Sequence, residues 1–197
     1  MKKINLIILF VSLFTIVTNA QETVDSFSNA YWNKDLTIEA SLENNNIKSV
    51  YLQVEAKDAK TAYISIDGKN VETFKASLKL VRDKYLNWIK VAKDNNITDM
   101  DKEFDISFPR ATVVWSGSKW WFSFNNRIRM RFLILDNGKM IALWNPKVTS
   151  SSNKYIDETI YFVFSCEEDF NELISKLDSQ AILDKLTAKR NNEDLFQ

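Results

Sequence analysis

The residues of this sequence best suited to recognition chemistry are two tryptophans and two arginines near the middle of the chain. Trp121, Arg131 and Trp144 are predicted to lie side by side on one face of a β-sheet, with Arg129 beside them. A guanidinium between two indoles makes cation–π contacts worth about 0.5–2 kcal/mol each, depending on desolvation. Flat indoles also form a platform for sugar rings, and guanidinium groups donate hydrogen bonds to hydroxyls or to a carboxylate. The four residues therefore predict a ligand-binding face for a saccharide or another small ligand.

The expected row depends on the register of a strand meander that begins near residue 110. Gly117-Ser118 and Asn137-Gly138 each suit a two-residue hairpin loop. At Asn125-Asn126 a three-residue loop is favoured, because a two-residue loop would set three arginines against a row of aromatic side chains. With this register the other face of the meander is wholly apolar and is predicted to be core. Its members are Val113, Trp115, Trp120, Phe122, Phe124, Ile128, Met130, Phe132, Ile134, Ile141 and Leu143.

The predicted ligand face also has a purely structural interpretation. A long amphipathic helix needs an apolar surface to cover, and the face that carries Trp121 and Trp144 could be that surface. Tryptophans are often buried with their polar end satisfied. The sequence leaves open whether this face is covered or free.

Hydrophobic periodicity predicts the elements that position these residues. Alternating apolar residues predict strands at 36–42, 50–56 and 62–66, and a further strand at 155–166 follows the meander. Between them, the apolar residues of 74–92 recur with the period of one helix face.

The segment that follows the first twenty residues and the C-terminal segment are predicted to differ in secondary structure. Residues 21–34 are expected to be irregular. Ser165 and Glu168 fit a capping box, after which apolar residues at helical spacing continue to Leu186. The predicted fold class is α+β: an antiparallel sheet of about eight strands with a C-terminal meander, on which one long central helix and a C-terminal helical segment pack.

The first twenty residues have the pattern of a secretory signal peptide. Lys2 and Lys3 precede an apolar run of about 14 residues, shorter than the roughly 20 that span a bilayer. Small residues at 18–20 predict cleavage after Ala20. We expect an exported protein, periplasmic or extracellular, with one globular domain at 21–197 and no membrane span once the signal is removed.

The composition excludes several classes of function. The chain has no His and a single cysteine, Cys166, which excludes Ser-His-Asp catalysis, His-containing zinc sites and an intrachain disulfide. Lys+Arg and Asp+Glu number 26 each, so no broad positive surface is expected for nucleic acid. No metal and no cofactor are predicted.

These observations together predict an exported, non-enzymatic ligand-binding module. The alternative is a protein–protein interaction module, such as an inhibitor or an envelope component that binds another envelope protein. A carboxylate-based hydrolase is the third possibility, because two suitably spaced acids suffice for glycoside hydrolysis.

Overall fold

The computed structural model describes residues 21–194, and the side chains of residues 21–191. This part contains eleven β-strands, three α-helices and the short 3-10 helix η1 (Gly68–Asn70). The strands are β1 (Glu22–Asn29), β2 (Lys34–Glu43), β3 (Asn46–Ala56), β4 (Ala62–Asp67), β5 (Met100–Glu103), β6 (Ala111–Ser116), β7 (Trp120–Asn126), β8 (Arg131–Ile134), β9 (Met140–Trp144), β10 (Lys147–Ser150) and β11 (Asn153–Phe164). The helices are α1 (Val71–Asp94), α2 (Glu167–Lys176) and α3 (Ser179–Asp194). The predicted signal peptide at 1–20 lies outside the described residues, so export stays a prediction.

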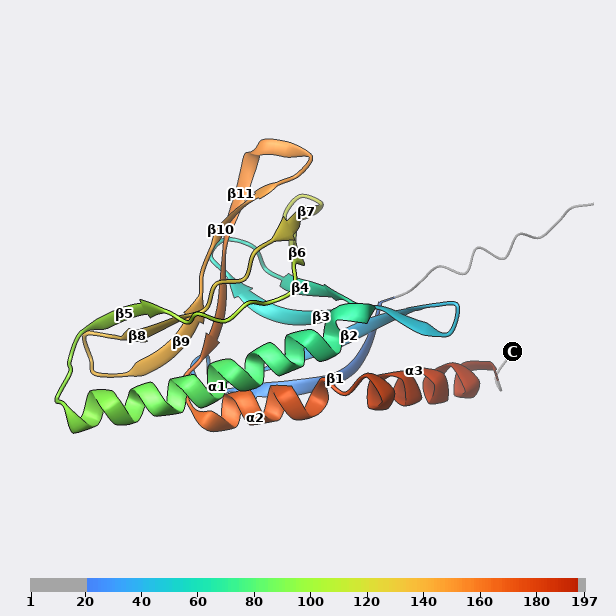
Figure 1. Cartoon of the computed structure of the whole chain (residues 1–197). Helices are drawn as coiled ribbons and strands as arrows, with labels where there is room; N and C mark the ends of the chain where they lie inside the picture. The colour runs from blue at the N-terminus through green and yellow to red at the C-terminus, as the bar shows by residue number, and fades with distance from the viewer. Residues whose placement is uncertain (1–20, 195–197) are drawn as a thin grey trace, which may run out of the picture.

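The strands form one antiparallel sheet (Figure 1), whose main order is β5-β8-β9-β11-β3-β4-β6-β7. β3 is its junction, because it pairs with β2, β4 and β11. β1 is added beyond β2, and β10 pairs with β11. Two wings extend from β3: the β7 wing (β4, β6 and β7) and the β5 wing (β11, β9, β8 and β5).

All three helices lie on one side of the sheet (Figure 1). Helix α1 follows η1, whose first turn is capped by Asp67, since its carboxylate accepts a hydrogen bond from the Lys69 amide at 3.2 Å. The helix buries the apolar face predicted from its period, including Phe74, Leu78 and Tyr85. The predicted α+β class, antiparallel sheet and long helix are confirmed.

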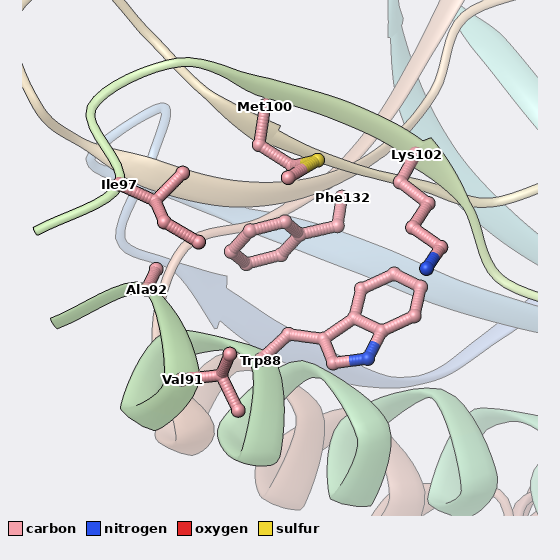
Figure 2. A pocket seen from close by; sticks show the side chains of 7 residues that line it. All are labelled: Trp88, Val91, Ala92, Ile97, Met100, Lys102 and Phe132. Carbon is pink, nitrogen blue, oxygen red and sulfur yellow. The ribbon is translucent and has the colours of Figure 1, made fainter. Parts of the chain in front are cut away.

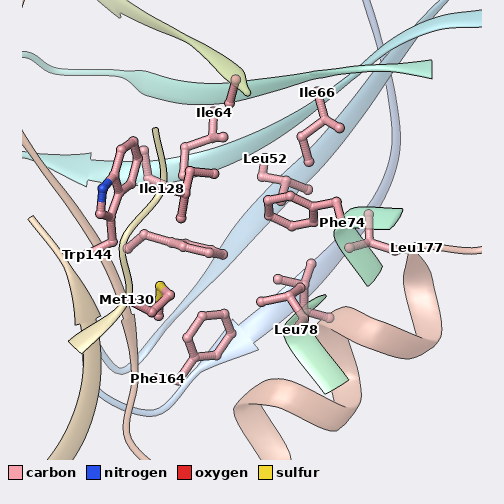
Figure 3. Packing of buried hydrophobic residues seen from close by; sticks show 14 of the residues in the cluster. Leu52, Ile64, Ile66, Phe74, Leu78, Ile128, Met130, Trp144, Phe164 and Leu177 are labelled. Carbon is pink, nitrogen blue, oxygen red and sulfur yellow. The ribbon is translucent and has the colours of Figure 1, made fainter. Parts of the chain in front are cut away.

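The main core fills the space between the helices and the sheet (Figure 3). Phe164 of β11 stacks on Phe170 of α2 with ring centroids 4.1 Å apart, and Phe74 of α1 meets Phe162 at 6.4 Å. Each such buried ring contributes about 1.5–3 kcal/mol through loss of water contact. The buried Tyr85 hydroxyl donates to the Met140 carbonyl at 2.9 Å, so its one polar atom is satisfied.

Three strands were not predicted, and the count of about eight was therefore too low. β1 lies within 21–34, which was expected to be irregular; only Phe27 and Asn29 of its side chains are buried, so it lacks a clear alternating apolar pattern. β5 and β10 have four residues each, too short for a period to be recognised.

Both hairpins of the meander differ from the predicted register by one residue. Trp121, rather than Trp120, pairs with Trp115, because three residues and not two connect β6 to β7. In the second hairpin Ile134, rather than Leu135, pairs with Met140. The Leu135 amide also donates to the Lys139 carbonyl at 2.9 Å, which leaves 136–138 as a three-residue loop. Gly138, at φ +77°, is its third residue, the left-handed position typical of such a loop.

The third predicted pairing, between the strands that flank Asn125-Asn126, is wrong because β7 and β8 are not neighbours. The outer edge of β7 instead meets the β10–β11 hairpin, where the Ser151 amide donates to the Phe122 carbonyl at 2.8 Å. β8 lies between β5 and β9 in the other wing. Asn125, at φ 61°, lies where the chain turns away from β7.

The predicted core is correct for eight of its eleven members. Trp120, Phe122 and Phe124 are exposed instead, because a register shift of one residue moves every side chain of a strand to the other face. Ile141 and Leu143 are buried, but in a second small cluster on the opposite face of the sheet.

The cap of α2 is shifted by one residue from the prediction. Cys166 is the N-cap residue, and Asp169, not Glu168, accepts from the Ser165 amide at 2.7 Å. Asp169 is buried and also accepts from the Ala30 amide at 2.8 Å, which ties the start of α2 to the end of β1.

Candidate functional site

Half of the exposed large apolar side chains in the described part lie on one strand. Trp120, Phe122 and Phe124 occupy alternate positions of β7 and are 49%, 42% and 61% exposed. Alternate residues of a strand project from the same face, and this face of the β7 wing is the one that the helices leave uncovered (Figure 1). Contiguous exposed apolar surface of this kind is typical of a binding site.

Two tyrosines extend this surface across the wing. Tyr63 of β4 lies 6.3 Å from Trp120 between ring centroids, and Tyr51 of β3 meets Tyr63 edge-on at 6.5 Å. Phe122 and Phe124 are near-parallel, with centroids 6.2 Å apart and planes inclined by 14°. We call these five residues the aromatic strip.

One apolar side chain, Val114, lies on the sheet between the rings of the strip. Val114 of β6 pairs with Tyr63 on one side and Phe122 on the other, and it is almost fully covered. The opposite face of the same strands carries buried Ile64 and Val113. Exposure of the strip therefore follows from the register and from the placement of the helices on the other side.

Hydrogen-bonding groups border the strip on the side of β2. The Tyr63 hydroxyl donates to Glu39 Oε1 at 2.8 Å, and the Thr37 hydroxyl donates to Gln53 Oε1 at 3.0 Å. Partial burial and the hydrogen bond to the Glu39 carboxylate raise the pKa of Tyr63 to about 12, so its hydroxyl stays a donor at neutral pH. Aromatic side chains beside a few carboxylate, amide and hydroxyl groups are typical of small-molecule binding sites.

The backbone of β7 is fixed at its outer edge. In addition to the bond from the Ser151 amide, the Ser151 hydroxyl accepts from the Phe124 amide at 3.1 Å. These two bonds from Ser151 fix the β7 backbone that carries Phe122 and Phe124, and they occupy part of the outer edge of the strand.

Of the predicted site residues, the two tryptophans lie on the core side. Trp144 is 4% exposed and packs in the main core. Trp121 is half-buried against the same core, with the Lys119 ammonium 4.5 Å from its ring centroid. The structural interpretation expected a covered face for both tryptophans, and both side chains pack on the main core.

Arg131 lies on β8 of the β5 wing and Arg129 lies just before that strand, and both are engaged by carboxylates of β5. Arg131 pairs with Asp101 at 2.7 Å, and Arg129 approaches Glu103 at 3.9 Å. The predicted row of Trp121, Arg131 and Trp144 therefore does not form, although no observation tests ligand binding by the separate residues. Arg129 lines a polar cavity of about 330 Å³ between segments 103–110 and 127–129.

Sequence reasoning identified the aromatic segment of β7 but assigned its rings to the core. The Asp136-Asn137-Gly138 segment contains a signal that favours the observed register of the second hairpin, because glycine in third position suits a three-residue loop. For the loop 117–119 the sequence gives no comparable signal, and the register of β7 is decided by its packing.

The buried acids of the described part serve the backbone. Glu158 accepts hydrogen bonds from the amides of Lys57, Asp58 and Ala59 at 3.1, 3.1 and 2.8 Å, which fixes the loop between β3 and β4. Cys166 is half-buried, and burial raises the pKa of its thiol to about 11, so it is a thiol at neutral pH.

Within residues 21–191, no group of three or more acidic, Cys or His side chains is arranged to hold a metal ion. Among the described helices, none is long and apolar enough to cross a membrane. Comparison with known proteins gives no matching family model, no matching curated protein and no matching solved structure.

Proposed function

We propose that the protein is an exported binding protein that holds a saccharide or a similar small ligand on the aromatic strip and catalyses no reaction on it. One observation carries this proposal: three aromatic side chains on alternate positions of β7 expose 42–61% of their surface on a face that no described helix covers. Exposure of so much aromatic surface to water is unfavourable. A ligand stacked on the rings removes part of that surface from water, which favours binding.

The polar border makes a small polar ligand the preferred occupant. Glu39, Thr37 and Gln53 offer acceptors and a hydroxyl within the same face as Tyr63. A sugar presents apolar C–H faces to rings and hydroxyls to such groups at once. The proposed ligand is therefore neutral or weakly charged and long enough to contact rings on both β4 and β7.

A thermal-shift panel of soluble oligosaccharides tests this function. A ligand that binds only the folded state raises stability by RT ln(1+[L]/Kd), about 2.7 kcal/mol at a hundredfold excess over Kd. Trp120→Ala and the pair Phe122→Ala with Phe124→Ala should abolish the shift. Tyr155→Ala is the matched control, because Tyr155 is 81% exposed on β11 and does not belong to the strip.

Hydroxyl-radical oxidation distinguishes an open strip from a covered one. Trp120 should oxidise several-fold faster than Trp115 and Trp144, which are buried. If Trp120 is as protected as these two, another part of the protein or a partner covers the strip, and a small-ligand function is wrong. If Trp120 reacts quickly but every sugar fails to shift the melting temperature, the protein–protein alternative replaces it.

The proposal of export has its own test. The full chain, expressed in a bacterial host with a secretion pathway, should yield a mature protein whose N-terminal residue is Gln21, as determined by intact mass. A mature protein that retains residues 1–20 contradicts the proposal.

A further inference from the structure

The free edge of the sheet at β5 lies beside an apolar cavity at the end of α1 (Figure 2). The cavity has a volume of about 110 Å³ and is lined by α1, β5, β8 and the connection between α1 and β5. Its lining residues are Trp88, Val91, Ala92, Ile97, Met100, Lys102 and Phe132. This volume is well below that of usual small-molecule pockets, about 300–1,000 Å³, and it suits a single apolar side chain.

The backbone of β5 offers hydrogen bonds along this edge. Within the described residues β5 pairs only with β8. The Phe104 amide donates to the Met130 carbonyl at 2.9 Å, and by the alternation of an antiparallel ladder Lys102 and Met100 also face β8 with their backbone groups. The amides and carbonyls of Asp101 and Glu103 therefore point away from the sheet, where an added strand would meet them.

The side chains of β5 alternate between the two faces of the sheet. Met100 and Lys102 face the cavity with Phe132, whereas Asp101 and Glu103 face the other side and interact with arginines. A strand added to this edge would place every second side chain over the cavity. Val91, which is 44% exposed at the rim, would then be covered.

Two ammonium groups lie beside the Trp88 ring, on the cavity side of the β5 edge. The Lys102 and Lys84 nitrogens lie 5.0 and 5.3 Å from the centroid of the Trp88 ring. Neither forms an ion pair with a carboxylate of residues 21–191, unlike Arg129 and Arg131 on the other face of this wing. An acidic side chain of a partner would be attracted to both lysines and would settle opposite Lys102.

We propose that the β5 edge binds an extended peptide segment as an added strand, with an apolar side chain in the cavity and an acidic side chain two residues away opposite Lys102. The spacing follows from strand geometry, since Met100 and Lys102 are two residues apart and adjacent strands keep this period. Main-chain hydrogen bonds to Asp101 and Glu103 provide affinity, and the cavity and the lysines select the sequence. This site lies in the β5 wing and is independent of the aromatic strip.

Selection from a random twelve-residue peptide library against the protein of residues 21–197 tests the proposal. The enriched peptides should share an apolar residue and an Asp or Glu two positions from it. A synthetic peptide of the enriched sequence should bind at least tenfold more weakly to Lys102→Glu, as measured by calorimetry at low salt. Lys79→Glu, an exposed lysine elsewhere on α1, is the matched control and should leave binding unchanged.

Ala92→Leu tests the cavity without opening a hole in the core. The added carbons occupy the space in which the peptide side chain would lie, so binding should fall at least tenfold while the melting temperature stays within a few degrees. Trp120→Ala should not change peptide binding, which separates this result from the fate of the aromatic strip.

Several results would overturn the proposal. These are a library that yields no enriched peptide, enriched peptides without the apolar and acidic pair, or peptide binding to Ala92→Leu and Lys102→Glu that is as tight as binding to the original protein. Binding of octanoate that Ala92→Leu abolishes, with no peptide enriched, would also contradict it, because the cavity would then be a site for an acyl chain.

Discussion

Trp115 and Trp120 are separated by a single hairpin turn, yet they lie in opposite environments. Trp115 is 2% exposed in the main core, and Trp120 is 49% exposed on the aromatic strip. Both are indoles on neighbouring strands of the same wing, so residue type does not explain the difference. The register of β7 does, because three loop residues rather than two place Trp120 opposite Ser116 and on the uncovered face.

The comparison shows that the two faces of the sheet use aromatic residues for different purposes. On the helix side the rings contact one another closely, as Phe164 and Phe170 do, and contribute to stability. On the strip the rings of Phe122 and Phe124 are 42% and 61% exposed to water. Stability and recognition should therefore respond to different substitutions.

The largest expected effect is on the helix side. Phe164→Ala removes a fully buried ring and leaves a cavity, which should lower the free energy of unfolding by about 3–5 kcal/mol. Urea denaturation measures the change. A loss below about 1 kcal/mol would mean that the helices do not pack on this face as described.

The next effect concerns the loop that joins the strands β3 and β4. Glu158→Ala leaves the amides of Asp58 and Ala59 without their acceptor, whereas the Lys57 amide keeps the Thr159 carbonyl at 2.9 Å. The loss should cost about 2 kcal/mol. Glu158→Gln is the matched variant and should cost less, since one acceptor oxygen remains. Equal losses for the two variants would show that the negative charge, not the acceptor geometry, matters.

A smaller effect is expected where α2 and α3 attach to β1. Burial alone would raise the pKa of Asp25, but hydrogen bonds from the Lys176 and Lys185 ammonium groups lower it to about 2. The folded-state pKa lies below the unfolded value, so this group stabilises the fold above about pH 4 and loses its contribution as the pH falls toward 2.

Asp25→Asn measures that contribution. The two lysines are partly exposed, so the stabilisation should be only about 1 kcal/mol. The difference in unfolding free energy between the original protein and the variant should be present at pH 6 and vanish near pH 2. A difference that persists unchanged at pH 2 would contradict the low pKa.

The smallest effect on stability is expected on the strip itself. Phe124→Ala should change the free energy of unfolding by no more than about 0.5 kcal/mol, because its ring is 61% exposed. Denaturation beside Phe164→Ala makes the comparison direct. A loss above about 2 kcal/mol for Phe124→Ala would mean that the strip is a packing surface. The aromatic residues on the two faces of the sheet would then not differ in purpose.

Much of the architecture could be predicted from local patterns in the sequence. The period of α1 identified the face that carries Phe74, Leu78 and Tyr85, and alternation identified β2, β3 and β4. These patterns are reliable because each of these elements buries one face, so its apolar residues recur with the period of a helix or of a strand. The candidate site could not be predicted in the same way, because it depends on which strands are neighbours.

Local patterns along the chain suffice to predict the α+β class, the long helix and the aromatic character of β7. They do not predict that β7 meets the β10–β11 hairpin instead of β8, or that Trp144 is buried while Trp120 is exposed. Strands have a two-residue period, so one additional loop residue exchanges the two faces of a strand although it costs little free energy locally. Packing of the whole sheet against the helices, rather than any short segment, selects between them.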